Sequence, residues 1–417
     1  MRGPRSTLRT GAPTGSSRQG LGVLFQGEPV FLSQSVGLGH GPLLTARRAR
    51  APEQLCHVEL VSKYALARKD LKTMLGLSNK AAVLHGIGDL RIEDRPVPVP
   101  GPRQVLVEVA SVGICGSDVH YYEHGRIGDF IVRSPMVLGH EASGVVVGRG
   151  DLAERHELGQ RVALEPGVPC GSCRECRTGH YNLCRDVVFF ATPPVDGALA
   201  RYVTINEDFA FALPDQVSDD AGALCEPLSV GLWACRKAEI RVGSRVAVAG
   251  AGPIGASVTL VALASGATEV IVSDPVPSRP ARLAEIGATA VVDSSSSSLQ
   301  KEAFDADVFI DCSGSPAAIL DGIRCVRPAG AAVLVGMCPS AEVPFPIASV
   351  QNREIRLTGT FRYANTYPEA IALIASGTIN LEGLVDARFS LESSEEALTA
   401  ARRDPSVLKP LVRVASS

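Results

Sequence analysis

Short apolar stretches separated by turn residues characterise the chain from Lys80 onward. Residues 81–84, 90–93 and 105–113 are apolar or alternating, and Pro and Gly cluster between them. This pattern is typical of strands joined by turns. Residues 144–148 and 161–165 continue it. The pattern predicts an antiparallel β domain.

The hydrophobic period changes in the second half of the chain. Residues 218–235 follow a helical period, and from residue 245 to about 337 strand-like and helix-like stretches alternate. Such alternation favours a doubly wound parallel sheet. After residue 357 we expect short strands again, a helix near 392–402 and a final strand at 411–414. An α/β domain would thus be inserted between two parts of a β domain.

A glycine-rich turn opens the α/β region, in the sequence Gly250-Ala251-Gly252-Pro253-Ile254-Gly255. The first glycine permits a tight turn, the second lets the backbone approach a pyrophosphate, and the third lets helix pack on strand. Amides at the following helix N-terminus attract phosphates. Asp274, at the end of the next strand, would bind a ribose diol and repel a 2′-phosphate. The motif predicts NAD in preference to NADP.

Residues 246–268 contain no charged side chain. A stretch of this length could cross a bilayer, so a membrane span is an alternative interpretation. The glycines at its first turn and the βα pattern that follows favour a buried strand and helix, and we expect no membrane segment.

Cys115, His140 and Glu141 form one candidate metal site. A mixed set of thiolate, imidazole and carboxylate suits a zinc ion that keeps a coordination position open for chemistry. The alternative is a buried cysteine, a capped histidine and a surface glutamate with no shared role.

A second candidate metal site lies between residues 170 and 184, where four thiols fall at short spacing: Cys170, Cys173, Cys176 and Cys184. This spacing in a turn-rich segment predicts a closed structural zinc site. A disulfide cluster would need an oxidising compartment. An iron–sulfur cluster is a further alternative.

Composition supports a two-domain intracellular enzyme. The 417 residues exceed one typical domain, and the net charge of −3 gives no reason to expect a nucleic-acid partner. Eleven cysteines with no recognisable secretory signal indicate the reducing cytosol, with thiols used for metal. We therefore expect a cytoplasmic protein.

Residues 1–73 differ from the remainder, with eleven Lys and Arg against four Asp and Glu. A disordered tail, an organellar transit peptide and a misassigned start all fit this composition. We expect either a tail or a misassigned start, with the domain beginning at Met74.

The chain from about residue 80 to 414 resembles the zinc-containing medium-chain alcohol dehydrogenase family, and within it the sorbitol (polyol) dehydrogenase group. The resemblance rests on five segments: Gly113-Ile-Cys-Gly-Ser-Asp-Val-His-Tyr, Val137-Leu-Gly-His-Glu-Ala-Ser-Gly, Glu226-Pro-Leu-Ser-Val-Gly, Gly250-Ala-Gly-Pro-Ile-Gly and Phe361-Arg-Tyr-Ala-Asn-Thr. The four-cysteine segment is a departure, because animal sorbitol dehydrogenases lack it. Substrate identity therefore stays open.

The resemblance implies an α/β fold class, with a GroES-like antiparallel β catalytic domain at 74–227 and 357–417. A doubly wound Rossmann NAD-binding domain would occupy 228–356, and 170–184 would form the structural zinc lobe. It also implies a homotetramer or homodimer.

Functional residues carry over by position in the resemblance. Cys115, His140 and Glu141 match the catalytic zinc ligands, and Glu226 matches a carboxylate that contacts substrate and a water at the metal. Tyr121, Arg362 and Tyr363 match substrate-pocket positions, and Arg279 matches an arginine that contacts the cofactor. From the chemistry, Ser117, His120 and Glu226 are candidates for moving the hydroxyl proton. Asp118 is expected to orient the His140 ring.

The implied activity is oxidation of a secondary hydroxyl of a small polyol, of the sorbitol or xylitol type, with hydride transfer to NAD+. The polar residues of the substrate positions suit a polyhydroxylated substrate better than a simple alcohol. L-idonate and threonine are alternative substrates. A non-catalytic zinc- and nucleotide-binding relative is the alternative from another class.

Overall fold

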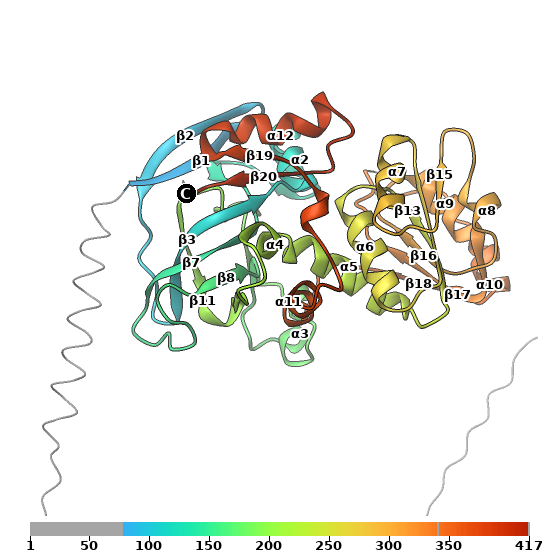
Figure 1. Ribbon diagram of the computed structural model, residues 1–417, viewed down its shortest axis with the longest axis horizontal. Helices are drawn as coiled ribbons and strands as arrows, with labels where there is room; N and C mark the ends of the chain where they lie inside the picture. Colours follow the sequence, from blue (N-terminus) through green and yellow to red (C-terminus); the bar gives the residue numbers. More distant parts are fainter. Residues whose placement is uncertain (1–77, 340–341, 416–417) are drawn as a thin grey trace, which may run out of the picture. The chain divides into compact units, whose positions relative to one another are not determined.

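The computed structural model describes residues 78–339 and 342–415, so the expectations for residues 1–73 lie outside the described residues. The largest sheet outside the α/β region has the strand order β12-β8-β7-β3-β20-β19, with β11 also paired to β3 (Figure 1). The pairings within it are antiparallel except between β19 and β20. This confirms the predicted antiparallel β domain.

The strands of this part are β1 (Ser78–Gly86), β2 (Asp89–Pro96), β3 (Gln104–Gly113), β4 (Arg126–Ile127), β5 (Phe130–Ile131), β6 (Met136–Val137), β7 (Glu141–Arg149), β8 (Arg161–Leu164), β9 (Gly167–Val168), β10 (Val188–Phe189), β11 (Tyr202–Asn206), β12 (Ala210–Ala212), β19 (Val385–Ser390) and β20 (Lys409–Arg413). Its helices are α2 (Gly116–His124), α3 (Arg174–Arg177), α4 (Asp219–Ala223), α5 (Cys225–Ala238), α11 (Tyr367–Ala375) and α12 (Ser394–Arg403), with 3-10 turns η1 (Tyr181–Leu183), η2 (Glu207–Phe209), η3 (Glu382–Leu384) and η4 (Leu391–Ser393).

The α/β region contains a parallel sheet in the order β15-β14-β13-β16-β17-β18. This is the strand order of a dinucleotide-binding fold. Its strands are β13 (Arg245–Ala249), β14 (Glu269–Asp274), β15 (Ala290–Asp293), β16 (Ala306–Asp311), β17 (Val326–Leu334) and β18 (Arg356–Gly359). Its helices are α6 (Pro253–Ala264), α7 (Ser278–Glu285), α8 (Leu299–Glu302), α9 (Pro316–Cys325) and α10 (Ile347–Asn352).

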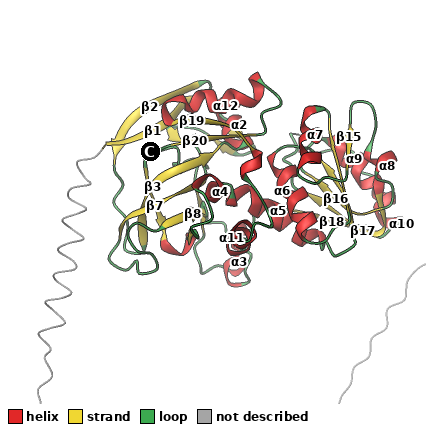
Figure 2. Cartoon of the chain, viewed as in Figure 1, coloured by secondary structure: helices red, strands yellow, loops and turns green. Residues whose placement is uncertain are grey.

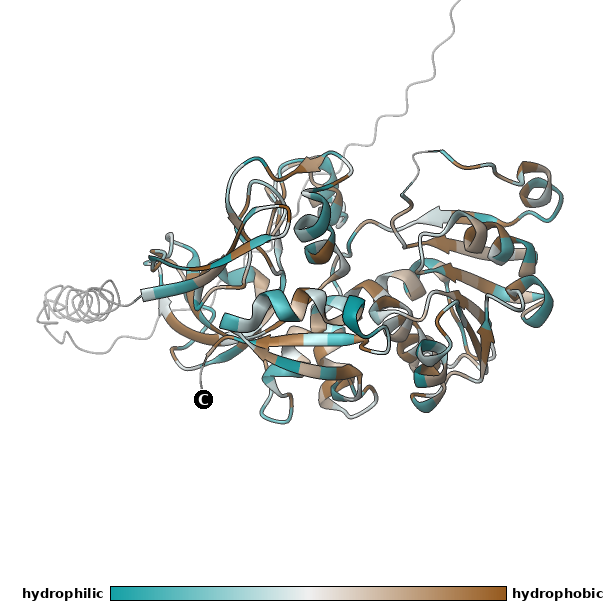
Figure 3. Ribbon diagram, turned by 90° about the horizontal axis from the view of Figure 1, so that it is seen from above, coloured by the Kyte–Doolittle hydropathy of each residue, from teal (hydrophilic) through white to brown (hydrophobic). Residues whose placement is uncertain are grey.

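Helices cover both faces of this sheet (Figure 2). Val246 and Val248 belong to a core shared with α5 and α6, whereas Ala247 and Ala249 belong to a core shared with α8 and α9. Successive strand residues point to opposite faces, so a strand buried on both sides must be apolar throughout. This explains the first part of the charge-free stretch, which is β13, and much of the remainder lies in α6, where more than half of the residues are buried. The strands carry much of the brown in Figure 3. Within the described residues, no helix combines the length and apolar character needed to cross a bilayer.

Two features after residue 355 differ from expectation. Strand β18 belongs to the parallel sheet, which therefore extends three residues beyond the boundary expected at 356. Residues 367–375, expected among short strands, form helix α11, which packs on α5. The buried positions Tyr367, Ala370 and Ile371 follow a helical period, with a proline in the first turn. That signal is present in the sequence, but the stretch is short enough to read as either element.

Strand register brings the site together. Gly113, the last residue of β3, pairs with Glu141 at the start of β7 and with Leu411 in β20. Cys115 follows β3 by two residues, and His140 immediately precedes β7. One pairing thus brings two ligand-bearing segments side by side at the end of the sheet.

Candidate catalytic zinc site

Cys115, His140 and Glu141 converge at the end of the sheet. A sulfur, a ring nitrogen and a carboxylate oxygen, one from each side chain, lie within 4.8 Å of one another. His140 and Glu141 are buried, and Cys115 is half-buried at the N-cap of α2. These donors and their mutual spacing fit a zinc ion bound by three protein ligands, with a fourth position free for substrate.

The backbone around Glu141 is shaped to hold its side chain. A Cβ atom on residue 113 would lie 2.0 Å from Glu141 Oε2, so a side chain there would displace this carboxylate from its present position. The carboxylate forms an ion pair with the Lys409 ammonium, and Lys409 Nζ also donates to the Ile114 carbonyl at 2.9 Å. Lys409 is only 2% exposed. Sequence reasoning missed it, although a lone lysine among apolar residues near the C-terminus was a usable signal.

Asp118 ties the two ligand-bearing segments together. Its carboxylate accepts hydrogen bonds from the Cys115 amide at 3.1 Å and the Gly139 amide at 2.9 Å. Asp118 Oδ1 lies 3.7 Å from His140 Nδ1, which is longer than a hydrogen bond. Burial alone would raise the pKa of Asp118, but the charge of His140 and the hydrogen bonds from the two amides stabilise the carboxylate more strongly. The pKa of Asp118 is therefore lowered. An ionised Asp118 therefore faces the ring of His140.

Glu226 lies in the first turn of α5 and is 5% exposed. Burial raises its pKa to about 7; the charge of Glu141 adds to the rise, while His140, Tyr363 and Lys409 oppose it. The carboxyl therefore lies within electrostatic reach of two of the metal-ligand side chains, His140 and Glu141, and of the predicted substrate residue Tyr363. It is placed to exchange a hydrogen bond or a proton with a molecule bound there.

Arg362 and Tyr363 follow β18 in the segment Phe361–Asn365. The Arg362 guanidinium lies 3.6 Å from the centre of the Phe189 ring and donates to Thr192 Oγ1 at 3.3 Å. Phe189 in turn packs against His140, with ring centres 5.7 Å apart. Sequence reasoning missed Phe189 and Thr192, since an aromatic residue in the two-residue strand β10 and a threonine shortly after it carry no signal of their own. Phe189 joins a metal ligand to the substrate segment.

Three further predicted residues lie on α2. Tyr121 is 4% exposed, and burial, reinforced by Asp118, raises its pKa to about 12. Its phenol therefore stays protonated at neutral pH. Ser117 is half-buried in the first turn. His120 is exposed, with its ring 5.2 Å from that of His124, a position that also suits an ordinary surface histidine.

The glycine turn of the α/β region has the geometry its sequence predicts. Gly250 has φ 95°, and a Cβ atom on Gly255 would lie 1.9 Å from the Gly250 carbonyl oxygen. A Cβ on Gly252, by contrast, would meet open space. The open backbone stands at the N-terminus of α6, where a pyrophosphate would approach.

The remaining cofactor positions lie on β14 and α7. The carboxylate of Asp274, at the end of β14, accepts hydrogen bonds from the Ala251 and Val276 amides, both at 2.9 Å. These bonds hold the carboxylate beside the glycine turn. Arg279 on α7 donates from Nε to the Pro405 carbonyl at 3.0 Å.

The four-cysteine segment forms a second convergent set. Four sulfur atoms lie within 4.8 Å of one another, those of Cys170, Cys173, Cys176 and Cys184. All four residues are free thiols. The amides of Cys170 and Cys173 donate to cluster sulfurs, each at 3.4 Å. Such bonds favour thiolates, the form that binds zinc. The arrangement fits a tetrahedral structural zinc site.

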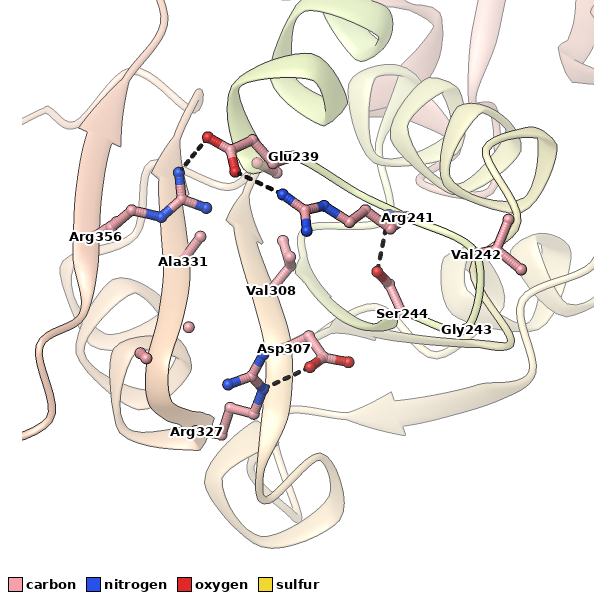
Figure 4. Close-up of a pocket in the computed structure, with 13 residues that line it drawn as sticks. Glu239, Arg241, Val242, Gly243, Ser244, Asp307, Val308, Arg327, Ala331 and Arg356 are labelled. Atoms are coloured by element: carbon pink, nitrogen blue, oxygen red, sulfur yellow. Dashed lines mark hydrogen bonds and ion pairs between the residues drawn. The ribbon is translucent and has the colours of Figure 1, made fainter.

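A cavity of about 410 Å³ lies elsewhere, at the amino ends of β13, β16 and β18 (Figure 4). The cofactor turn is at the opposite, carboxyl edge of the same sheet. The arginines around the cavity are already paired: Arg327 with Asp307, and Arg241 and Arg356 with Glu239. Two of these arginines share one carboxylate, so the lining keeps a single net positive charge, and each guanidinium already has an acidic partner.

Comparisons with known proteins agree with this geometry. The alcohol dehydrogenase GroES-like domain family matches residues 101–215, and the zinc-binding dehydrogenase family matches residues 253–376. Sorbitol dehydrogenase of Bos taurus is 46% identical over 333 residues, which cover 78% of this chain and 93% of the bovine protein.

Among solved structures, an Escherichia coli oxidoreductase of unknown specificity superimposes with a TM-score of 0.78 at 33% identity, covering 82% of this chain and all of that one. L-idonate 5-dehydrogenase from the same organism superimposes with a TM-score of 0.76 at 30% sequence identity. The match covers 81% of this chain and 98% of that enzyme. The expected fold, a GroES-like domain with a Rossmann domain, is confirmed. The chain belongs to the zinc-containing medium-chain alcohol dehydrogenases, in the group of the sorbitol dehydrogenases.

Proposed function

We propose that this protein is a zinc- and NAD-dependent dehydrogenase that oxidises a secondary hydroxyl of a sorbitol- or xylitol-type polyol to the ketone. The observation that carries the proposal is the convergence of Cys115, His140 and Glu141 beside the buried Glu226. The bovine relative with 46% identity is named a sorbitol dehydrogenase, which supports the same substrate class.

Cys115, His140 and Glu141 would hold the catalytic zinc, and the four cysteines of 170–184 a structural one. A zinc ion at the first site supplies Lewis-acid polarisation of the substrate hydroxyl, which favours its loss of a proton. The glycine turn and Asp274 would hold NAD+, which would supply an acceptor for the hydride of the substrate carbon. The products are the ketone, NADH and one proton.

The side chains around the zinc ligands orient the polyol and move the proton. Arg362, Tyr363 and Tyr121 offer hydrogen-bond partners for the hydroxyls that do not react. Glu226 accepts a hydrogen bond from the reacting end and passes the proton toward water, with Ser117 and His120 as further candidates. Arg279, whose Nε donates to the Pro405 carbonyl, is a further candidate for contacting the cofactor.

We also infer a homo-oligomer, a dimer or a tetramer, and a cytoplasmic setting in which the thiols stay reduced. Light scattering of the purified protein measures the oligomer directly. A monomer at micromolar concentration would contradict this part of the proposal.

The function is tested by NADH formation with zinc-replete protein against sorbitol, xylitol, L-idonate, threonine and ethanol. Preferential turnover of sorbitol or xylitol supports the proposal. Preference for L-idonate would favour the second candidate, which the structural neighbour named for that substrate supports. Absence of turnover across the panel, with both zinc ions and NAD bound, would contradict a polyol dehydrogenase.

A further inference from the structure

The substrate segment Phe361–Asn365 has an unusual backbone. Arg362 and Asn365 both have φ 55°, in the left-handed region that residues other than glycine seldom adopt. The conformation costs on the order of 1 kcal/mol per residue, somewhat less for asparagine. It persists only where neighbouring groups hold it. The contacts of this segment therefore decide where Arg362 and Tyr363 point.

The contacts come from the four-cysteine lobe, residues 170–184. Asn182 Nδ2 donates to the Phe361 carbonyl at 2.8 Å, at the start of the segment. At its end, the Asn365 amide donates to the Tyr181 hydroxyl at 2.8 Å, and Asn365 Nδ2 donates to the Gly179 carbonyl at 3.1 Å. Both ends of a five-residue segment are thus bonded to one short turn of the lobe.

The turn of the lobe that makes these bonds, residues 179–182, is fixed by its own contacts with the β domain. The Tyr181 hydroxyl donates to Glu165 Oε1 at 2.6 Å, and the Tyr181 ring meets Phe209 edge-on, with ring centres 5.8 Å apart. Asn182 is 5% exposed. Glu165 follows β8 directly and is 2% exposed. The hydroxyl of Tyr181 therefore links the sheet to the Asn365 amide.

Arg362 and Tyr363 lie between the two anchored ends. Arg362 covers the Phe189 ring. Tyr363 is 3% exposed, and its hydroxyl has no hydrogen-bond partner among the described residues. Both residues line a small hollow together with Tyr181 and Asn182. If the hydrogen bonds at either end of the segment were lost, the side chains of Arg362 and Tyr363 would change position.

We propose that Tyr181 and Asn182 are positioning residues of the polyol site. They hold the Phe361–Asn365 segment in the strained conformation that aims Arg362 and Tyr363 at the substrate. The inference rests on the proposed function, in which those two residues bind the hydroxyls that do not react. It gives the lobe a part in substrate selection besides its part in stability.

The test is Tyr181→Phe in the full-length, zinc-loaded enzyme, with Asn182→Ala as a second variant. Tyr202→Phe is the matched control, because Tyr202 also donates to a glutamate, Glu108 at 3.3 Å, but lies in β11. The expected result for Tyr181→Phe is a KM for sorbitol or xylitol raised roughly 5- to 20-fold. We expect kcat, the KM for NAD+ and the zinc content to stay within about twofold of wild type.

A second readout is independent of activity. The Asn365 amide loses its acceptor in Tyr181→Phe, so hydrogen exchange in a peptide covering residues 360–367 should accelerate. Tyr202→Phe should leave that peptide, and the polyol KM, unchanged.

Three outcomes would overturn the inference: an unshifted polyol KM in Tyr181→Phe, an equal rise in the KM for NAD+, or loss of lobe zinc. The last two would show a merely structural role. Failure of the wild-type enzyme to oxidise any polyol would instead contradict the proposed function. The two failures are therefore distinguishable.

Discussion

The two metal-ligand sets of this chain are built in opposite ways. Cys115 and His140 are 25 positions apart in the sequence and meet because β3 pairs with β7. The four lobe cysteines fall within 15 consecutive residues, of which only Asn182 and Cys184 are buried. The first set is positioned by a sheet and its core. The second lies in a segment with almost no core, which a bound metal would have to organise.

The two ways of placing metal ligands suit two different tasks, catalysis at the first site and stabilisation of the lobe at the second. A catalytic site needs ligands whose geometry does not change when substrate enters, so it benefits from a rigid frame of strands. A structural site needs only that all four coordination positions of the metal are filled by protein ligands, and thiolates at short sequence spacing can fill them. Loss of a ligand should therefore affect chemistry at the first site and folding at the second.

The largest effect is expected for Cys115→Ser. Removal of the thiolate should lower kcat/KM for the polyol by at least about 1000-fold, a loss of about 4 kcal/mol of transition-state stabilisation. Bound zinc should fall by one ion per chain, and the melting temperature should change by less than about 3 °C, because the sheet frame remains. Atomic absorption, kinetics and thermal unfolding measure the three quantities. A collapse of the fold would contradict the contrast.

Glu226→Ala comes next. The carboxyl faces the ligand set without belonging to it, so kcat should fall roughly 100- to 1000-fold while both zinc ions stay bound. The exposed Glu154→Ala is the matched control and should keep wild-type kinetics. Turnover close to wild type in Glu226→Ala would exclude the role assigned to this residue.

Cys173→Ser reverses the pattern of Cys115→Ser. Zinc should again fall by one ion per chain, but the melting temperature should drop by several degrees and the lobe should become sensitive to protease. Because the lobe anchors the substrate segment, the polyol KM should rise while kcat keeps at least about a tenth of its wild-type value. An abolished kcat with an unchanged melting temperature would break the comparison between the two sites.

The smallest effect concerns Glu165, beside the lobe. Burial raises its pKa to about 7, the charge of Glu226 adds to the rise, and the Tyr181 hydroxyl opposes it. Tyr363 and Tyr367 also lie within reach of its charge. The folded-state pKa thus exceeds the unfolded value, so folding favours the protonated carboxyl. Its contribution to stability is present below pH 4.5 and is lost as the pH rises through 7.

Glu165→Gln keeps an acceptor for Tyr181 and removes the charge. The variant should be more stable than wild type at pH 8, by up to about 3 kcal/mol, and nearly equal at pH 5. Thermal unfolding at both pH values measures the difference, with the exposed Glu154→Gln as control. An equal difference at pH 5 and pH 8 would show that Glu165 does not titrate in this range.

Much of the fold could be predicted because its signals are local. The charge-free strand and helix, the glycine turn and Asp274 all fall within about thirty residues, so their geometry follows from short-range sterics. Helix α11 was missed because its nine residues depend on packing against α5. The extent of β18 was missed because an edge strand of four residues is defined only by its partner β17.

The sequence by itself determined which chemical groups are available: two sets of metal-binding side chains, a phosphate-binding turn and an acid at the end of the next strand. Residue type and short spacing are enough for these. Only the tertiary structure decided that Lys409 pairs with Glu141, that Phe189 lies between His140 and Arg362, and that the lobe holds the substrate segment. These partners are far apart along the chain, and their contacts depend on strand register and side-chain packing, which no local pattern encodes.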